Sequence, residues 1–126
     1  MNKKLIIQIP CLNEEDNLPI TLSELPRNID GIDTVEWLII DDGSTDSTVK
    51  IAKKYGVDHI ISHKQNRGLA AAFKSGLDFS INNNADIIVN TDADNQYCSK
   101  DIDKLVQPIL SGDAEIVIGA RPISEI

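Results

Sequence analysis

The stretch that decides the fold is LIIDDGSTDST, residues 38–48, in which an apolar run stops at two adjacent carboxylates. The apolar residues Trp37–Ile40 predict a buried strand, and Gly43 gives the backbone the freedom to turn after it. Ser44 or Thr45 is expected to cap the helix that follows. A buried strand that turns directly into a helix is typical of an α/β protein.

The same alternation of strand and helix continues in both directions. Further strands are expected at Leu5–Ile9, Val57–Ser62, Asp86–Asn90 and Glu115–Gly119, with helical patterns at residues 13–25, 44–55, 68–77 and 102–109. Asn13 resembles the N-cap of the first helix, Gly56 the stop of the second, and Gly68 the start of the third. In that third helix Leu69, Phe73 and Leu77 are expected on one face. The β-branched runs predict a mostly parallel sheet between helices.

Composition describes one soluble domain. The chain has 126 residues, of which 41% are hydrophobic and 25% charged. Its net charge of −8 argues against nucleic acid or an anionic membrane as a partner. Cys11 and Cys98 lie far apart, which favours reduced thiols in the cytoplasm. No apolar stretch approaches the roughly 20 residues needed to span a bilayer.

Polar motifs follow the strands at one edge of the predicted sheet. They are Pro10–Glu14, Asp41–Ser44, Asn66–Gly68, Asp92–Asp94 and Gly119–Arg121. In an open parallel sheet, ligands bind beyond the carboxyl ends of the strands. The convergence of these motifs predicts the functional site at this edge.

The motif after the fourth strand suits a metal ion. Asp92, Asp94 and Gln96 alternate, so an extended backbone would project their oxygen atoms to one side. Oxygen ligands favour Mg²⁺ or Mn²⁺. The alternative is a chain-reversing turn at Asp94 or Asn95. The acidic pair Asp41–Asp42 at the neighbouring strand favours the metal.

Other candidate groups carry weaker signals. Arg121 follows a strand and a glycine, and its forked donors suit phosphate, but a solvated surface arginine is the alternative, as it is for Arg67. His59 and His63 are four residues apart without a nearby acid or third ligand, so a zinc site is not favoured. No histidine is placed in sequence to activate Cys11 as a nucleophile.

Five stretches, taken together, resemble a known family. They are IPCLNEEDNL (9–18), LIIDDGSTDST (38–48), NRGLAAAFKSGL (66–77), NTDADNQY (90–97) and IVIGAR (116–121). In this order they resemble the nucleotide-sugar-binding half of family 2 glycosyltransferases, which have the Rossmann-like GT-A fold. The resemblance is strongest to the branch that contains dolichyl-phosphate mannose synthases and bacterial polyprenyl-phosphate glycosyltransferases.

The resemblance implies a role for each matching residue. The nucleobase and ribose would be surrounded by Pro10, Leu12, Glu14, Ile40 and Asp42, and Gly68 would allow close approach of the backbone. The metal and diphosphate would be held by Asp92, Asp94 and Gln96, and the diphosphate would also be contacted by Arg121. Many relatives have an aromatic residue where Leu12 stands, so weaker stacking on the base is expected. The implied reaction is an inverting transfer of a sugar from a UDP- or GDP-type donor, with Mg²⁺ or Mn²⁺, to a lipid phosphate or a saccharide.

The resemblance also implies an incomplete enzyme. Residues 1–126 match the donor-binding part of a single GT-A domain, so the acceptor-binding segment, the general base and any membrane helices would follow Ile126. Membrane association would come only from those segments, and the truncated chain is expected to be inactive unless they are supplied. Self-association into a homo-oligomer stays open.

Two other classes of protein remain as alternatives. A sugar-phosphate nucleotidyltransferase needs a basic, glycine-rich loop after the first strand, where this chain reads PCLNEEDNL. A non-catalytic, receiver-like Mg²⁺-binding domain needs a lysine after a late strand, where this chain has Gly119-Ala120-Arg121.

Overall fold

The computed structural model describes residues 3–91, 93 and 116–117 of the chain. Its elements are β1 (Lys4–Cys11), α1 (Leu18–Glu24), β2 (Thr34–Asp41), α2 (Thr48–Lys54), β3 (His59–Ser62), α3 (Leu69–Asn82), β4 (Ile87–Asn90) and β5 (Ile116–Val117). The helix expected at residues 102–109 lies outside the described residues. The five expected strands are all present, with ends that differ by a few residues from the prediction.

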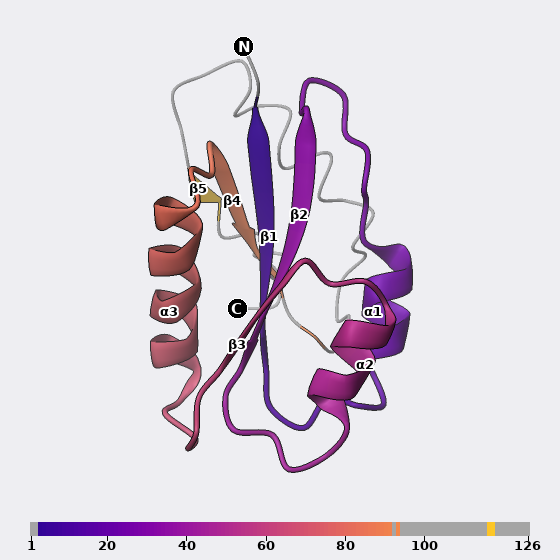
Figure 1. Ribbon diagram of the computed structural model, residues 1–126, viewed down its shortest axis with the longest axis vertical. Coiled ribbons are helices and arrows are strands. Elements are labelled where there is room, and N and C mark those ends of the chain that lie inside the picture. Colours follow the sequence, from indigo (N-terminus) through magenta and orange to yellow (C-terminus); the bar gives the residue numbers. More distant parts are fainter. Residues whose placement is uncertain (1–2, 92, 94–115, 118–126) are drawn as a thin grey trace, which may run out of the picture.

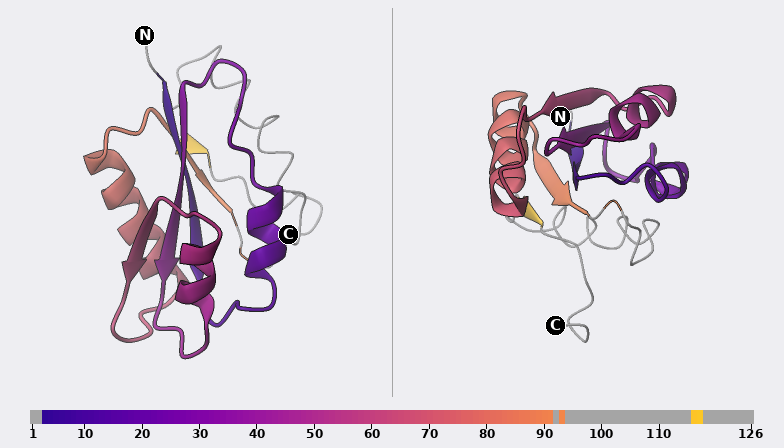
Figure 2. Two further views of the ribbon diagram at one scale, coloured as in Figure 1. Left: turned by 45° about the vertical axis from the view of Figure 1, so that its right-hand side comes forward. Right: turned by 90° about the horizontal axis from the view of Figure 1, so that it is seen from below.

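The strands form one parallel sheet in the order β3-β2-β1-β4-β5. Helix α3 covers one face, and α1 and α2 lie side by side on the other (Figure 1; Figure 2, right). The prediction of a parallel α/β sheet between helices is therefore confirmed. Because β1 is flanked by β2 and β4, the strand order reverses beside β1, where ligands bind in folds of this kind.

The core consists of one apolar cluster on each face of the sheet. Alternate side chains of a strand point to opposite faces, and β1 follows this rule. Leu5, Ile7 and Ile9 belong to the cluster that includes residues of α1 and α2. Ile6 belongs to the other cluster, with Ile40 of β2 and a residue of α3. The apolar side chains of β1 are thus divided between the two clusters, as expected for a strand that is covered on both faces.

Helix α3 turns its small residues toward the sheet. Its buried residues are Ala72, Gly76 and Ser80. Leu69, Phe73 and Leu77 share one side of the helix as expected, but Leu69 is 69% exposed and the other two are half-buried, so this side is not the main contact with the sheet. Small residues let the helix axis approach the strands closely, and the larger apolar side chains then lie at the sides of the contact.

A buried polar side chain explains why a glycine lies in the middle of α3. Gln8 of β1 is fully buried, and its amide nitrogen donates to Asn90 Oδ1 at 3.1 Å and to the Phe73 carbonyl at 3.3 Å. Its amide oxygen accepts a bond from Ser80 Oγ at 3.4 Å. A Cβ atom on Gly76 would lie 2.8 Å from the Gln8 amide group. Glycine at this position therefore leaves room for the Gln8 side chain.

The starts of the first two helices also differ from the prediction. Helix α1 begins after Asn17 rather than after Asn13, and α2 begins after Ser47 rather than after Ser44 or Thr45. The polar side chains that were expected to cap helices make contacts between loops instead, as described below. The end of α2 at Gly56 is as predicted, and this glycine has a φ of +79°.

Candidate functional site at the carboxyl edge of the sheet

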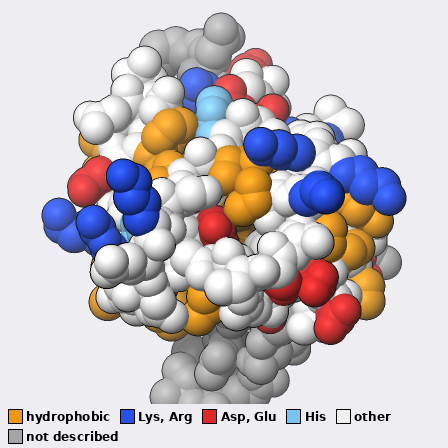
Figure 3. All heavy atoms as spheres, turned by 60° about the horizontal axis from the view of Figure 1, so that its bottom comes forward, with side chains coloured by type: hydrophobic (Ala, Val, Ile, Leu, Met, Phe, Trp, Pro, Cys, Tyr) orange, Lys and Arg blue, Asp and Glu red, His pale blue; other side chains and the backbone are white. Residues whose placement is uncertain are grey.

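A cavity of about 220 Å³ opens at the carboxyl ends of β1 and β2. It is lined by Pro10, Cys11, Leu12, Asp42, Asn66, Gly68, Leu69 and Ala72. On this end of the molecule, hydrophobic side chains gather near the middle beside an acidic one, and Lys and Arg side chains lie toward the rim (Figure 3). The site is thus an apolar pocket with one acidic wall, placed where the parallel sheet predicts a ligand.

The loops that follow β1 and β2 are hydrogen-bonded to each other. The Asn13 amide donates to Ser44 Oγ at 2.8 Å, and the Thr45 amide donates to Asn13 Oδ1 at 2.8 Å. The Glu14 amide donates to Thr48 Oγ1 at 2.9 Å. Asn13 has a φ of +54°, a conformation that asparagine tolerates better than most residues. The loop after β2 therefore fixes the loop that carries Leu12 at the pocket.

Asp42 anchors a third loop to the same site. Its Oδ1 accepts the Arg67 amide at 2.9 Å and its Oδ2 accepts the Gly68 amide at 2.9 Å. His63 Nδ1 lies 2.8 Å from Asp42 Oδ1. Burial alone would raise the pKa of Asp42, but the His63 contact and these two amides lower it below its usual value. Asp42 is therefore ionised at neutral pH and holds loop 63–68 against the end of β2.

The neighbouring Asp41 stabilises the turn that follows β2. Adjacent residues of a strand face opposite ways, and Asp41 Oδ1 accepts the Ser44 amide at 3.1 Å within the turn that Gly43 opens. Gly43 has a φ of +88°, and a Cβ there would lie 3.0 Å from the Asn66 amide nitrogen. Within residues 3–91, 93 and 116–117, no group of three or more His, Cys, Asp or Glu side chains is placed to hold a metal ion. The acidic pair that favoured a metal is thus accounted for by loop contacts.

The Cys11 thiol is buried in the wall of the pocket. Burial raises its pKa far above the usual value, and the charges of Glu14, Asp41 and Asp46 add to the effect. A thiolate nucleophile needs a lowered pKa. The structure therefore agrees with the expectation that Cys11 is not a nucleophile.

The residues expected at the site fall into three groups. Pro10, Leu12, Asp42 and Gly68 line the pocket. Glu14 and Ile40 do not: Glu14 lies in the interlocked loop, and Ile40 is fully buried in the cluster beneath, next to Ala72. Asp92, Asp94, Gln96 and Arg121 lie outside the described residues. Contact with a nucleotide remains a prediction for all of them.

One residue of the acidic motif lies within the described part of the chain. Ala93, the middle residue of Asp92-Ala93-Asp94, is 3% exposed, and its carbonyl oxygen accepts a 2.7 Å hydrogen bond from Thr21 Oγ1 of α1. The preceding Thr91 is hydrogen-bonded through its amide to the Gln8 carbonyl at 3.0 Å, beyond the end of β4. The backbone of the motif is therefore tied to β1 and α1 at the carboxyl edge.

Several residues at the site were not expected there. Leu69 and Ala72 line the pocket beside Asn66 of the expected Asn66–Gly68 motif, and their place directly after that motif at the start of a helix was the available signal. His63 contacts Asp42 although they are 21 residues apart. The continued register of β2 and β3 could have indicated this contact, because Asp41 pairs with Ser62 and His63 follows.

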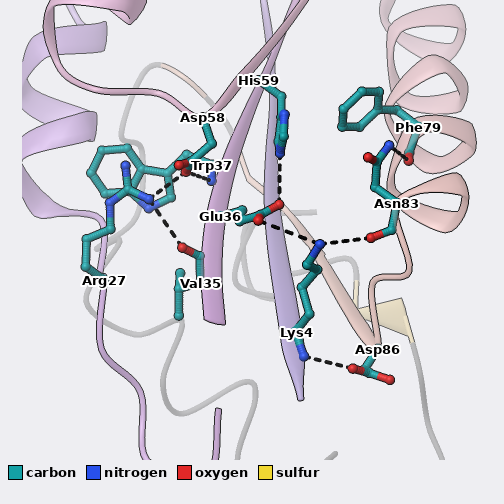
Figure 4. A network of polar contacts seen from close by, with 10 residues as sticks. All are labelled: Lys4, Arg27, Val35, Glu36, Trp37, Asp58, His59, Phe79, Asn83 and Asp86. Carbon is teal, nitrogen blue, oxygen red and sulfur yellow. Dashed lines mark hydrogen bonds and ion pairs between the residues drawn. The ribbon is translucent and has the colours of Figure 1, made fainter. Parts of the chain in front are cut away.

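The opposite end of the sheet is occupied by a different polar network (Figure 4). His59 Nε2 lies 2.8 Å from Glu36 Oε1, and Lys4 Nζ lies 3.6 Å from Glu36 Oε2. The expectation that neither histidine has a nearby acid is wrong, since His59 contacts Glu36 and His63 contacts Asp42. The two rings have different partners, in agreement with the interpretation that they are not a zinc pair.

On the other face of β2, the same view shows the Arg27 guanidinium stacked on Trp37, 3.6 Å from its ring centre, and bonded to Asp58 at 2.6 Å (Figure 4).

Within the part of the chain that the structure describes, none of the helices has the length and apolar character needed to cross a membrane.

The parallel sheet, covered by helices on both faces, is an α/β fold of the GT-A class. The chain belongs to glycosyl transferase family 2, whose family model matches residues 6–126. It is 34% identical to the UDP-N-acetylglucosamine–dolichyl-phosphate N-acetylglucosaminyltransferase of Methanococcus voltae, over 95% of this chain and 53% of that protein. It is 27% identical to the polyprenol monophosphomannose synthase of Mycolicibacterium smegmatis, over 94% of this chain and 45% of that protein.

A solved structure shares the fold. The glucosyl-3-phosphoglycerate synthase of Mycobacterium tuberculosis, in complex with Mn²⁺, UDP and glucosyl-3-phosphoglycerate, superimposes with a TM-score of 0.70 at 25% identity. The match covers 88% of this chain and 41% of that one. The chain spans about half the length of the curated relatives it matches.

Proposed function

We propose that residues 1–126 form the donor-binding part of a glycosyltransferase that takes a sugar from a UDP- or GDP-type donor. The observation that carries this proposal is the pocket at the carboxyl edge, whose lining includes Pro10, Leu12, Asp42 and Gly68. These four residues are among those that the family resemblance assigns to the nucleotide. Membership of glycosyl transferase family 2 supports the same conclusion.

The chemistry of the pocket suits a nucleoside. Leu12 and Leu69 are large apolar side chains that are 41% and 69% exposed at the pocket, so a planar base could cover apolar surface there. Asp42 supplies a carboxylate acceptor for a base or ribose donor. The cavity is smaller than the roughly 300–1,000 Å³ typical of whole-ligand sites. It therefore matches the nucleoside portion of a donor, with the diphosphate and sugar lying beyond it.

Asp92, Asp94 and Gln96 would hold a divalent cation. All three offer oxygen atoms, which suit Mg²⁺ or Mn²⁺, and the backbone at Ala93 is anchored at the carboxyl edge by Thr21. The Mn²⁺ and UDP in the synthase complex support this assignment. When bound, such a cation stabilises the negative charge of the departing diphosphate. We infer that Arg121 contacts the same diphosphate and that the acceptor attacks the anomeric carbon from the opposite face, which inverts its configuration.

We infer a lipid-phosphate acceptor of the polyprenyl class. The names of the Methanococcus and Mycolicibacterium relatives refer to dolichyl phosphate and to a polyprenol. A lipid phosphate is already an anion and needs no strong general base for attack. The acceptor would be bound by the part of the relatives' length that this chain does not cover. Catalysis would then take place at the cytoplasmic face of a membrane, and a saccharide acceptor would be the alternative.

Calorimetric titration with UDP and GDP, each with and without Mn²⁺, tests the proposal. We expect one nucleotide to bind in a metal-dependent way, and Asp94→Ala to abolish the metal dependence. Unchanged metal-dependent affinity in Asp94→Ala would contradict the assigned metal site. Stronger binding of a nucleoside triphosphate plus a sugar phosphate would favour the nucleotidyltransferase alternative. Binding of Mg²⁺ without any nucleotide affinity would favour the receiver-like alternative.

A further inference from the structure

His63 lies between Asp42, which lines the pocket, and Ser75 of helix α3, without lining the pocket itself. Its Nδ1 atom is 2.8 Å from Asp42 Oδ1, and its Nε2 atom is 2.9 Å from Ser75 Oγ of α3. The side chains of His63 and Asp42 are each 6% exposed. The His63 amide also donates to the Asp41 carbonyl at 2.8 Å, which continues the pairing of β3 with β2. Both ring nitrogens and the backbone of this residue are therefore engaged.

The contact with Asp42 fixes the protonation of one ring nitrogen. An ionised carboxylate can only accept hydrogen bonds, and Asp42 is ionised at neutral pH because its pKa is lowered. The proton must then reside on Nδ1, which donates to Asp42. In the neutral ring Nε2 accepts the Ser75 hydroxyl proton, and in the charged ring it donates to the same oxygen. Ser75 can satisfy either state by rotating its hydroxyl group.

The orientation of Asp42 decides the shape of one pocket wall. Each of its two oxygens accepts a backbone amide, from Arg67 and from Gly68, so the plane of the carboxylate has to stay fixed for both bonds to form. Asn66 and Gly68 line the pocket in this same loop. A rotated carboxylate would release one of the two amides and the loop that they hold.

We propose that His63 is a positioning residue of the nucleotide pocket. Its Nδ1–H group donates a hydrogen bond to Asp42 and thereby keeps the wall formed by Asn66 and Gly68 in the shape that binds the nucleotide. The proposal rests on the proposed function, because it concerns affinity for the nucleotide. His63 itself touches no ligand in this assignment. A simple packing role is the competing explanation, and it predicts that only the size of the side chain matters.

Two amide substitutions separate these explanations. The amide nitrogen of asparagine is as many bonds from Cα as Nδ1 of histidine, and that of glutamine is as many bonds away as Nε2. His63→Asn can therefore keep the bond to Asp42, whereas His63→Gln reaches toward Ser75 instead. If only packing mattered, glutamine would be the better replacement because it is the larger of the two.

The first test is the affinity for UDP and GDP with Mn²⁺ in the full-length protein. We expect His63→Asn to stay within about threefold of the parent and His63→Gln to bind about tenfold more weakly or worse, since a hydrogen bond to a charged group is lost. Ser75→Ala is the matched control, which removes the other ring contact and should stay within about threefold. Equal losses for asparagine and glutamine, or no loss for glutamine, would overturn the inference. A parent protein that binds neither nucleotide would instead overturn the proposed function, and this inference with it.

A second measurement begins with the unsubstituted protein. Ring-nitrogen NMR shifts of His63 in the ligand-free parent protein should report the tautomer with the proton on Nδ1. In Asp42→Asn, in which a neutral amide replaces the carboxylate, those shifts should change markedly. The assigned contact would be refuted by a proton on Nε2 of the neutral ring, or by ring-nitrogen shifts that are the same in the parent and in Asp42→Asn.

Discussion

The hydroxyl group of Thr21 donates a 2.7 Å hydrogen bond to the carbonyl oxygen of Ala93, and both residues are buried. Helix α1 thereby holds the backbone between Asp92 and Asp94. A helix on one face of the sheet thus positions a motif that follows its fourth strand.

Thr21→Val should destabilise the protein by about 1–3 kcal/mol, because it leaves the Ala93 carbonyl buried without its side-chain donor. Urea unfolding measures this loss. Thr21→Ser retains a hydroxyl group and is the control, and it should recover part of the stability. A Thr21→Val protein as stable as the parent would show that the bond contributes nothing net.

Gly43→Ala should lower both stability and nucleotide affinity. Its φ of +88° disfavours any side chain by about 1–2 kcal/mol. The new Cβ would also lie 3.0 Å from the Asn66 amide nitrogen and 3.1 Å from the Gln65 carbonyl carbon, next to the pocket wall. Urea unfolding and calorimetry with UDP and GDP measure the two effects.

Gly56→Ala is the matched control for this substitution. Gly56 has a similar φ of +79°, but a Cβ there would meet no atom within 4 Å. We expect it to lower stability through backbone strain alone and to leave nucleotide affinity unchanged. Equal affinity losses at the two glycines would mean that the Asn66 contact is irrelevant to the pocket.

Gly76→Ala should destabilise the protein, although alanine is normally favoured over glycine inside a helix by about 1 kcal/mol. The reversal is expected because the added Cβ would overlap the buried Gln8 amide. A double-mutant cycle with Gln8→Ala, followed by urea unfolding, tests this explanation. The cost of Gly76→Ala should shrink or change sign once the Gln8 side chain is gone, and an unchanged cost would refute the overlap.

The stability that Asp42 contributes should depend on pH in the acid range. Its pKa in the folded protein is lowered from a usual value of 3.8, so folding favours the ionised form. This contribution is fully present above the unfolded-state pKa and is lost as the pH falls through the lower folded-state pKa. The difference in unfolding free energy between the parent and Asp42→Asn should therefore shrink as the pH falls below about 4. A difference that stays unchanged below that pH would contradict the direction of the shift.

Cys11 should resist alkylation in the folded protein. Its thiol is buried and its pKa is raised, so little thiolate is available to react. Iodoacetamide labelling at pH 8 of a Cys98→Ser variant, read by mass spectrometry, isolates this residue. We expect labelling only after urea is added, and rapid labelling of the native protein would show that the pocket wall opens.

The sheet was predictable because its strands are continuous apolar runs that end at polar turns. The starts of α1 and α2 were not, because Asn13, Ser44 and Thr45 have side chains that can cap a helix or bridge two loops equally well. Only the proximity of the two loops, which depends on the pairing of β1 with β2, decides between these outcomes. The residues around each loop do not reveal that the two loops lie close together.

The residues through which α3 packs on the sheet could not be predicted, for a related reason. Apolar periodicity identifies the largest hydrophobic side chains, whereas this helix packs through Ala72, Gly76 and Ser80 around the buried Gln8. At the site, Pro10, Leu12, Asp42 and Gly68 could be assigned from the family motifs. His63 could not, because its role depends on a carboxylate that a separate strand places beside it.

Among the residues that the structure describes, those that line the pocket lie between Pro10 and Ala72, upstream of β4 at Ile87–Asn90. During synthesis the ribosome therefore completes these described walls before it begins the strand that leads to the acidic motif. In the proposed assignment, the nucleoside end of the site is thus encoded early in the message and its diphosphate end late.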